Sequence, residues 1–370
     1  MIKSIKFLCG RSHPMRKYKL CASVSILMCC LWSIGIFAQG DASGPAKEFQ
    51  IVGKRSSPLP GIESDRAYPL LNSRGEIVGS YKSVEAQDGK KYLGTLQNGA
   101  SFLIDPLTYL IVSKDGSRVI TYGDEIDFHE VANVKVKLYS TNGDLIKSLV
   151  TDIWAPFAFA VQDNGDFWIA GRKGYNGGAS VIARYTSSGD LSGEIRLTSN
   201  YAPMRLIFSP DNTSAVLILY NHREGGRLFH YFDANGALKH VQELSDGSYG
   251  AEFLSNDKVL VYSGRQWKLY DMNESLTLVS SGQLKGNPLG EYPVTRLPDG
   301  SSFTIVTLGN REAGTGYRVQ AVRADNGQVF AESVLEGAPH WQPYRFLQVS
   351  SAGTVELFAD DEIVELQINN

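Results

Sequence analysis

Residues 204–220 have the sequence MRLIFSPDNTSAVLILY, in which two apolar runs flank a short polar segment centred on Asp211-Asn212. Apolar runs on both sides of a turn pair are the pattern of a β-hairpin. The second run, Ala215–Tyr220, is almost wholly apolar, as expected of a strand that is packed on both faces. This stretch therefore predicts two paired strands inside a buried sheet.

Turn pairs of this kind occur seven times along the 370 residues. Measured at the second residue of each pair, the gaps are 41, 49, 47, 45, 43 and 53 residues. A nearly fixed period of this size is typical of repeat architectures, and hairpins at this period are typical of the blades of a β-propeller. The seven pairs are Arg74-Gly75, Asp115-Gly116, Asn164-Gly165, Asp211-Asn212, Asn256-Asp257, Asp299-Gly300 and Ala352-Gly353.

The first six repeats contain a second turn, which leaves room for four strands in each repeat. Asn-Gly is frequent in these turns, and we expect type I′ hairpins because Asn and Gly tolerate the positive φ that this turn needs at both central positions. No stretch shows a helical period. The second turns are Asn98-Gly99, Asn142-Gly143, Ser188-Gly189, Asn235-Gly236, Asn273-Glu274 and Asn326-Gly327.

The seventh repeat lacks a fourth strand. Its expected strands are Arg345–Ser350, Thr354–Ala359 and Glu362–Ile368, and the sequence ends two residues later. An apolar strand without a repeat of its own, Glu48–Gly53, lies near the N-terminus. We expect it to complete the last blade and close the sheets, because closure removes an exposed edge. The prediction is an all-β, seven-bladed propeller over residues 41–370.

Several short phrases resemble the strand and turn phrases of WD-repeat and YVTN-type propellers. They are Lys268–Asp271, Tyr231–Asp233, Phe208–Asp211 and Leu297–Gly300, and the resemblance covers nearly all of residues 48–370. No repeat has the Gly-His and Trp-Asp pair of true WD repeats. The resemblance implies a seven-bladed fold and no particular activity, so function has to be argued from a site.

Residues 1–40 have the order of a cleavable secretory signal. A basic leader without acidic residues precedes an apolar run, Cys21–Ala38. Cleavage after Ala38 or after Gly40 fits the small-residue rule in part, and Met15 is an alternative start. Two alternatives remain open. The apolar run could stay as an uncleaved anchor, because 18 residues nearly span a bilayer, or Cys29 could carry a lipid.

All four cysteines lie in this leader, so the mature chain has none. It therefore cannot form disulfides, build a thiolate metal site or use a Cys nucleophile. This pattern favours export to a bacterial periplasm or the cell exterior. Without the six basic residues of the leader, 30 Lys and Arg face 39 Asp and Glu, a net charge of −9. An acidic mature chain argues against general nucleic-acid binding.

The motifs of common propeller-associated enzymes are missing. The sequence has no Gly-x-Ser-x-Gly elbow and no Asp-x-Asp-x-Asp-Gly calcium loop. Ser113–Gly116 lacks the Trp that should follow in a sialidase Asp-box. We therefore assign no catalytic residue and expect no cofactor.

The densest polar cluster follows the expected second strand of the second repeat. Its carboxylates could hold calcium or another hard cation; alternatively, they only keep a hairpin tip in water. The metal candidates are Asp124, Asp127 and Glu130, next to Glu125 and His129. The other histidines show no ligand spacing, and we expect His230 and His240 on exposed strand faces.

An aromatic residue stands at the start of the first strand in every repeat. Tyr and Trp offer a large surface with a polar tip, which suits stacking on sugar rings or anchoring a partner. Alternatively, each ring is a wedge between neighbouring blades. Trp154 and Trp341 depart from the Tyr pattern and are the binding candidates. The series is Tyr68, Tyr109, Trp154, Tyr201, Tyr249, Tyr292 and Trp341.

A cation recurs in the loops after the second strands. On an acidic chain, a local arc of Arg would suit an anionic group, because the guanidinium binds carboxylate or phosphate with two hydrogen bonds. Alternatively, these charges are solvated and paired locally. The second and seventh repeats carry acid instead. The series is Lys82, Arg172, Arg223, Arg265 and Arg311, and the four Arg are ligand candidates.

These observations favour an exported, non-catalytic binding or scaffold propeller. Its loop face would recognise an envelope protein or an anionic polysaccharide, with no nucleic acid and no membrane span after signal cleavage. The alternative is a metal-assisted lyase, lactonase or hydrolase at the channel mouth. A third possibility is a structural subunit of an envelope complex.

Overall fold

The computed structural model describes residues 46–56, 67–87, 89–124, 133–173, 178–197, 201–221, 225–244, 250–263, 266–273, 276–284, 294–297, 302–308, 317–335, 346–350, 353–358 and 362–368. The chain divides into Met1–Gly44 and Pro45–Asn370, and every described residue belongs to the second unit. The expected leader, residues 1–40, lies outside the described residues. Within the described ranges there is no helix, and hence none that could serve as a membrane span.

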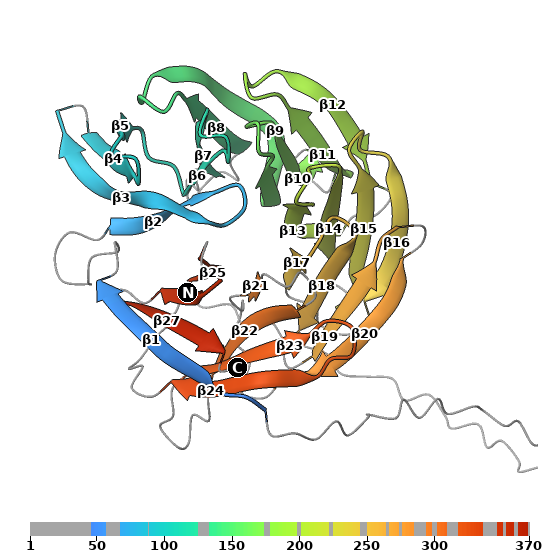
Figure 1. Ribbon diagram of the computed structural model, residues 1–370. Coiled ribbons are helices and arrows are strands. Elements are labelled where there is room, and N and C mark those ends of the chain that lie inside the picture. Colours follow the sequence, from blue (N-terminus) through green and yellow to red (C-terminus); the bar gives the residue numbers. More distant parts are fainter. Residues whose placement is uncertain are drawn as a thin grey trace, which may run out of the picture. The chain divides into compact units, whose positions relative to one another are not determined.

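The described strands form five sheets (Figure 1). The sheet with the order β1-β27-β26-β25 contains β1 (Phe49–Ser56), β25 (Phe346–Val349), β26 (Val355–Phe358) and β27 (Glu362–Ile368). Three more sheets have four strands each, in sequence order. They contain β13 (Ala202–Phe208), β14 (Ser214–Tyr220), β15 (Arg227–Asp233) and β16 (Leu238–Leu244); β17 (Gly250–Phe253), β18 (Lys258–Ser263), β19 (Gln266–Asp271) and β20 (Thr277–Gln283); and β21 (Val294–Arg296), β22 (Ser302–Leu308), β23 (Tyr317–Arg323) and β24 (Val329–Leu335).

The fifth sheet has eleven strands in the order β12-β11-β10-β9-β8-β7-β6-β2-β3-β4-β5. Its members are β2 (Ala67–Asn72), β3 (Ile77–Ala86), β4 (Gly89–Leu96), β5 (Ser101–Ile104), β6 (Tyr109–Val112), β7 (Val119–Asp124), β8 (Asn133–Tyr139), β9 (Leu145–Val161), β10 (Phe167–Lys173), β11 (Ser180–Tyr185) and β12 (Leu191–Arg196). Separate sheets are therefore not seen for the first three repeats of the sequence.

Two links join those repeats. Strand β2 pairs in parallel with β6, where Leu71 is opposite Ile111. Strand β9 is 17 residues long, and its first half pairs with β8 while its second half pairs with β10. Residues 145–161 contain no Gly, and their one proline, Pro156, lies inside β9 without ending it.

The predicted turn positions are confirmed where both residues of the pair are described, whereas the predicted turn type is wrong. The pair Asp299-Gly300 and the residues Glu274 and Ala352 lie outside the described residues. The second residue has positive φ in most of the predicted pairs that are described, as in Gly75 (74°) and Asn212 (59°). Among the described residues, Asn212 is the one non-glycine with positive φ, so the first turn positions do not have the φ that type I′ requires.

The hydrogen bonds show which hairpin replaces it. Gly75 N donates to Asn72 O at 2.9 Å, and Asn72 N donates to Glu76 O at 2.9 Å. This is a three-residue loop that ends in a left-handed glycine with a bulge. Asn and Asp are favoured at the preceding position because their side chain accepts a backbone N–H two residues on, as Asn98 does from Ala100.

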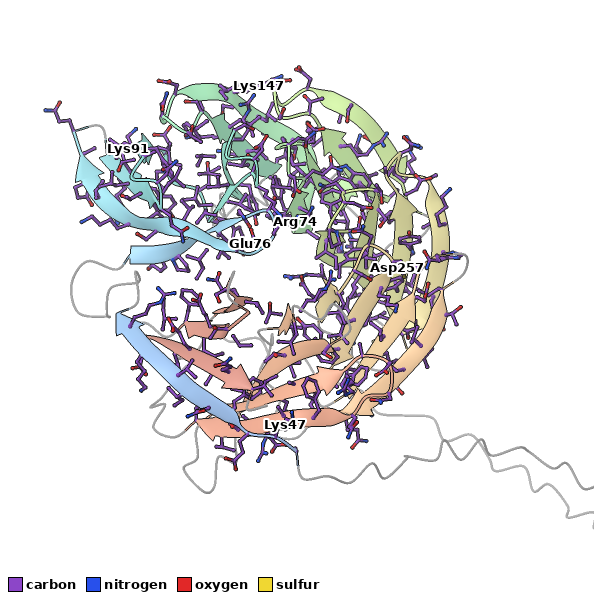
Figure 2. All side chains as sticks on the ribbon, viewed as in Figure 1. Lys47, Arg74, Glu76, Lys91, Lys147 and Asp257 are labelled. Atoms are coloured by element: carbon purple, nitrogen blue, oxygen red, sulfur yellow. The ribbon has the colours of Figure 1, made fainter. Side chains whose placement is uncertain are left out.

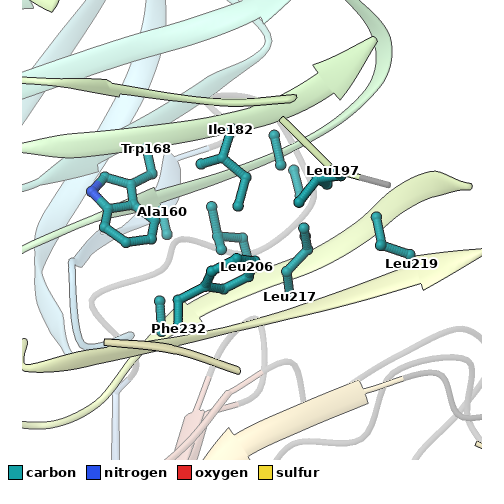
Figure 3. Packing of buried hydrophobic residues seen from close by; sticks show 11 residues of the cluster. Ala160, Trp168, Ile182, Leu197, Leu206, Leu217, Leu219 and Phe232 are labelled. Carbon is teal, nitrogen blue, oxygen red and sulfur yellow. The ribbon is translucent and has the colours of Figure 1, made fainter. Parts of the chain in front are cut away.

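The sheets pack face to face through apolar side chains. Figure 3 shows Ala160, Trp168 and Ile182 of the eleven-stranded sheet against Leu206, Leu217 and Phe232 of the β13–β16 sheet. Strand β14 is buried along six of its seven residues, because it has a neighbouring sheet on each face. The first strand of each repeat (β2, β6, β13, β17, β21 and β25) and the second half of β9 are the inner strands. The outer strands are the last strand of each repeat (β5, β12, β16, β20 and β24), β1 and the first half of β9 (Figure 1).

The strand expected at Glu48–Gly53 is present as β1 and pairs with β27, with Phe49 opposite Ile368. Lys47, which precedes it, forms a parallel bridge to Ala331 in β24. The segment from Lys47 to Ser56 thus contacts two successive sheets. On the other side of the last sheet, Phe358 and Ile363 pack against Ile77 of β3.

Candidate functional site

The candidate site lies at the end of the eleven-stranded sheet where β9 changes partner. Trp154 is opposite Asn133 on β8 and opposite Arg172 on β10. Arg172 is in turn opposite Ser180 on β11. Residues directly opposite in a sheet project from the same face, so the four side chains form one row. The sequence predicted Trp154 and Arg172 independently, and the structure brings them together.

This row faces the junction with the next sheet. Ser180 is buried, and its Oγ donates to the backbone oxygen of Tyr201, just before β13, at 2.9 Å. Trp154, Arg172 and Tyr201 remain partly exposed. A guanidinium beside an amphipathic indole at a sheet junction can hold an anionic group and a ring together.

The neighbouring cation, Lys173, is bound by two carboxylates. It forms ion pairs with Asp152, at 2.9 Å, and with Glu194. These partners, Glu194 above all, raise the pKa of Lys173. Neighbouring carboxylates therefore neutralise the charge of Lys173. This agrees with the alternative stated above, in which the loop cations are paired locally.

Asp124 ends β7, and its backbone is opposite Val134, one residue from the row that contains Asn133. Nothing further is described of its side chain. The other metal candidates, Asp127 and Glu130, lie outside the described residues, as do the ligand candidates Arg223, Arg265, Arg311 and Trp341. In the part of the chain that is described, no three His, Asp or Glu residues are grouped as metal ligands.

The histidine prediction is wrong for His230. Its side chain is buried in β15, where both faces of the sheet are covered, and its ring centroid lies 6.0 Å from that of Phe232. Desolvation lowers the pKa of His230 to about 4. His240 is half-buried and stacks on Tyr231, with ring centroids 5.9 Å apart.

The aromatic series splits into two kinds. Tyr201 packs against the cluster between two sheets, as a wedge would. Tyr109 instead keeps half of its surface exposed and stacks on Tyr122 at 5.1 Å. Tyr68 stacks on Tyr81 at 5.4 Å. Burial, followed by its neighbours Tyr92 and Tyr68, raises the pKa of Tyr81 to about 12, so this phenol is neutral at physiological pH.

A second polar group on the inner strands was missed by the sequence reasoning. Arg205 of β13 lies 3.8 Å from Glu252 of β17, and both side chains keep 38 % of their exposure. Desolvation raises the pKa of Glu252, while Arg205 and Arg74 act in the opposite direction. Protein therefore surrounds this carboxyl although water still reaches it. The signal in the sequence was a charge within each of two otherwise apolar inner strands.

The chain matches no protein-family model and no curated protein. Among solved structures it is similar to a chain in the crystal structure of the mitotic checkpoint complex, with 10 % identity, a TM-score of 0.53, and coverage of 89 % of this chain and 98 % of that one. It is similar to streptogramin B lyase, with 14 % identity, a TM-score of 0.53, and coverage of 86 % and 98 %. It is also similar to hydrazine synthase of Kuenenia stuttgartiensis, with 14 % identity, a TM-score of 0.52, and coverage of 81 % and 95 %.

Identities this low bear on the fold and not on the activity. The structures that match have propeller folds of the WD-repeat kind, and the described residues of this chain form an all-β set of sheets packed face to face. The protein therefore has a β-propeller-like fold, as the turn period and the resemblance to WD-repeat and YVTN-type propellers predicted.

Proposed function

We propose that the protein is an exported, non-catalytic binding propeller whose loop face recognises an anionic envelope polysaccharide. The observation that carries this proposal is the cross-strand pairing of Trp154 with Arg172. The indole offers a surface on which a sugar ring stacks, and the guanidinium offers two parallel hydrogen bonds to a carboxylate or sulfate. The remaining loop cations, Arg223, Arg265 and Arg311, would extend the same surface.

The proposal includes the finer features of the fold. Seven blades follow from the seven turns, with the eleven-stranded sheet supplying three of them. The segment Phe49–Ser56 closes the last blade against β27. Residues 1–40 act as a signal peptide, so N-terminal sequencing of the exported protein should begin at Gln39 or Asp41. A partner protein with an acidic surface is the other ligand that the arginines of the loop face would bind.

Affinity electrophoresis tests the proposal. Gels containing polygalacturonate, a sulfated dextran or neutral dextran are run with the wild type, Arg172→Ala, Trp154→Ala and Lys173→Ala. We expect the acidic polymers to retard the wild type, and Arg172→Ala or Trp154→Ala to restore mobility. Lys173→Ala is the matched control, because Asp152 and Glu194 already neutralise this cation.

The salt dependence adds a second readout. Retardation through a loop cation should weaken as the ionic strength rises. If neither acidic polymer retards the wild type relative to neutral dextran, the polysaccharide proposal is overturned. Retardation of the wild type that Arg172→Ala leaves unchanged would move the interface to another surface.

A second candidate function is a metal-assisted enzyme that uses the acidic segment after β7. One observation favours it: Asp124, the first of the metal candidates, ends β7 at the same end of the sheet as Asn133 and Trp154. Streptogramin B lyase has a similar fold and is, by its name, an enzyme. A calcium-dependent rise in melting temperature that Asp124→Asn abolishes would favour this candidate.

A further inference from the structure

Two exposed apolar side chains differ from all the other described ones in the kind of strand on which they lie. Fourteen large apolar side chains are exposed among the described residues, and twelve of them lie on outer strands. The other two, Tyr109 (50 % exposed) and Met204 (38 %), lie on the inner strands β6 and β13. An exposed apolar side chain on an inner strand is not explained by the outward face of a sheet, and it can mark a contact with a ligand.

Met204 is exposed because β13 contains a bulge. Pro203 is opposite Leu219 and Arg205 is opposite Ile218, so Met204 is an extra residue without a partner in the ladder. A bulge re-aims the side chains next to it. Met204 is exposed and Arg205 is half-buried, whereas the residues on either side of them, Pro203 and Leu206, are buried. The bulge therefore presents a thioether and a guanidinium side by side.

The charge that faces Arg205 comes from the next sheet. The guanidinium of Arg205 and the carboxylate of Glu252 are 3.8 Å apart, at the long limit of an ion pair, and both keep more than a third of their surface. A loose and accessible pair can be bridged by a ligand, whereas a tight bidentate pair uses up its donors and acceptors.

We propose that Arg205 and Glu252 bind the zwitterionic head group of a free α-amino acid with an apolar side chain, and that Met204 contacts that side chain. Arg205 binds the ligand carboxylate and Glu252 binds its ammonium group. The two protein charges cancel, as do the two ligand charges, so binding leaves no uncompensated charge. Met204 adapts to side chains of different shapes, because its thioether chain is flexible and polarisable.

This site is distinct from the polysaccharide surface. Trp154 lies where β9 changes partner and Arg172 lies near the end of β10, whereas Arg205 and Glu252 lie within the inner strands β13 and β17. The ligand also differs, since a neutral zwitterion replaces an anionic polymer. Failure of one proposal therefore leaves the other to be judged on its own variants.

Calorimetric titration of the full-length protein tests the proposal. The probes are L-leucine, L-leucinamide, N-acetyl-L-leucine and glycine. We expect L-leucine to bind, and each of the other three to bind about tenfold more weakly or worse, because each lacks one contacting group. L-leucinamide lacks the carboxylate, N-acetyl-L-leucine lacks the ammonium group, and glycine lacks the apolar side chain.

The variants assign each group to its partner. Arg205→Gln should abolish the preference for L-leucine over L-leucinamide and keep the preference over N-acetyl-L-leucine. Glu252→Gln should do the reverse, and Met204→Ala should reduce the preference over glycine. Lys147→Ala, which removes an exposed outer-strand ion pair with Asp190, is the control and should bind L-leucine as the wild type does.

Two results would overturn the assignment. One is the absence of heat from the wild type with L-leucine up to millimolar concentration. The other is unchanged discrimination among the four probes in Arg205→Gln and Glu252→Gln that melt at the wild-type temperature. Arg172→Ala should leave the affinity for L-leucine unchanged, which separates this test from that of the polysaccharide surface.

Discussion

The guanidinium of Arg74 lies 2.7 Å from the carboxylate of Asp163, a residue 89 positions further along the chain. Arg74 also donates to the backbone oxygen of Ser209 at 2.7 Å and to that of Pro210. Its side chain is only 13 % exposed. One side chain thus joins the β2–β3, β9–β10 and β13–β14 turns, and Figure 2 shows Arg74 on the inner side of the sheets.

Loss of this side chain should destabilise the fold. Arg74→Ala removes the ion pair with the half-buried Asp163 carboxylate and the hydrogen bonds to two carbonyl oxygens, and we expect the free energy of unfolding to fall by about 2 kcal/mol. Denaturant unfolding measures the change. Lys54→Ala is the control, because its ion pair with Glu362 is exposed and should contribute less than about 1 kcal/mol. Equal losses from both variants would contradict the role given to Arg74.

Strand β1 should contribute through its buried face. Phe49 is 6 % exposed and packs in the cluster formed by the last two sheets, whereas Ile51 on the same strand is 47 % exposed. Phe49→Ala should lower the free energy of unfolding by about 3 kcal/mol, because a buried ring is lost. Ile51→Ala should change it by less than about 1 kcal/mol. Thermal melting of the two variants checks the difference, and a small loss with Phe49→Ala would show that β1 adds little to the fold.

His230 should make stability depend on pH. Its pKa is about 4 in the native state, because of desolvation, against 6.5 for an ordinary histidine. Between these values the unfolded chain binds a proton that the native protein does not. The stabilisation is therefore complete above pH 6.5 and is lost as the pH falls toward 4, by about 3 kcal/mol.

The matched variant isolates this effect from the carboxylates, which titrate in an overlapping range. His230→Leu should reduce the fall in the free energy of unfolding between pH 7 and pH 4.5, measured in urea. A pH dependence identical to that of the wild type would rule out His230 as its source.

The turn at Asn212 should prefer glycine. Asn212 has φ of 59°, and its N–H donates to Ser209 O at 2.9 Å. Asn212→Gly should be neutral or slightly stabilising, whereas Asn212→Ala should cost about 1 kcal/mol, because a Cβ is disfavoured in the left-handed region. Asn256→Ala, at an exposed turn residue without positive φ, is the control. Melting temperatures that do not separate the two Asn212 variants would contradict this account.

Local signals predicted the strands and turns well. Asn-Gly and Asp-Gly pairs mark positions that need one left-handed residue, and Gly99, Gly116 and Gly165 have that conformation. Strand β27 has the predicted bounds, and β14 begins one residue before the predicted strand. Turn type was missed, because a glycine serves a bulged three-residue turn as well as a type I′ turn.

The features that depend on distant contacts were not predictable. Nothing in the sequence around Arg74 shows that it reaches Asp163, since neither the repeat period nor the charge pattern connects the two turns. The opposition of Trp154 and Arg172 follows from strand register, which two separate loop patterns could suggest but not establish. The sequence shows Arg205 and Glu252 as charged residues within apolar segments, but their pairing depends on the packing of two sheets.

The continuous strand β9 has a consequence for how the protein unfolds under force. Repeat proteins usually lose structure unit by unit, because each unit contacts only its neighbours. Here the second and third repeats share one strand, so neither can detach while the other keeps its hydrogen bonds. When pulled from its ends, the chain should release the part built around β9 as a single large step, and a cleavage engineered at Ile153 should divide that step into two.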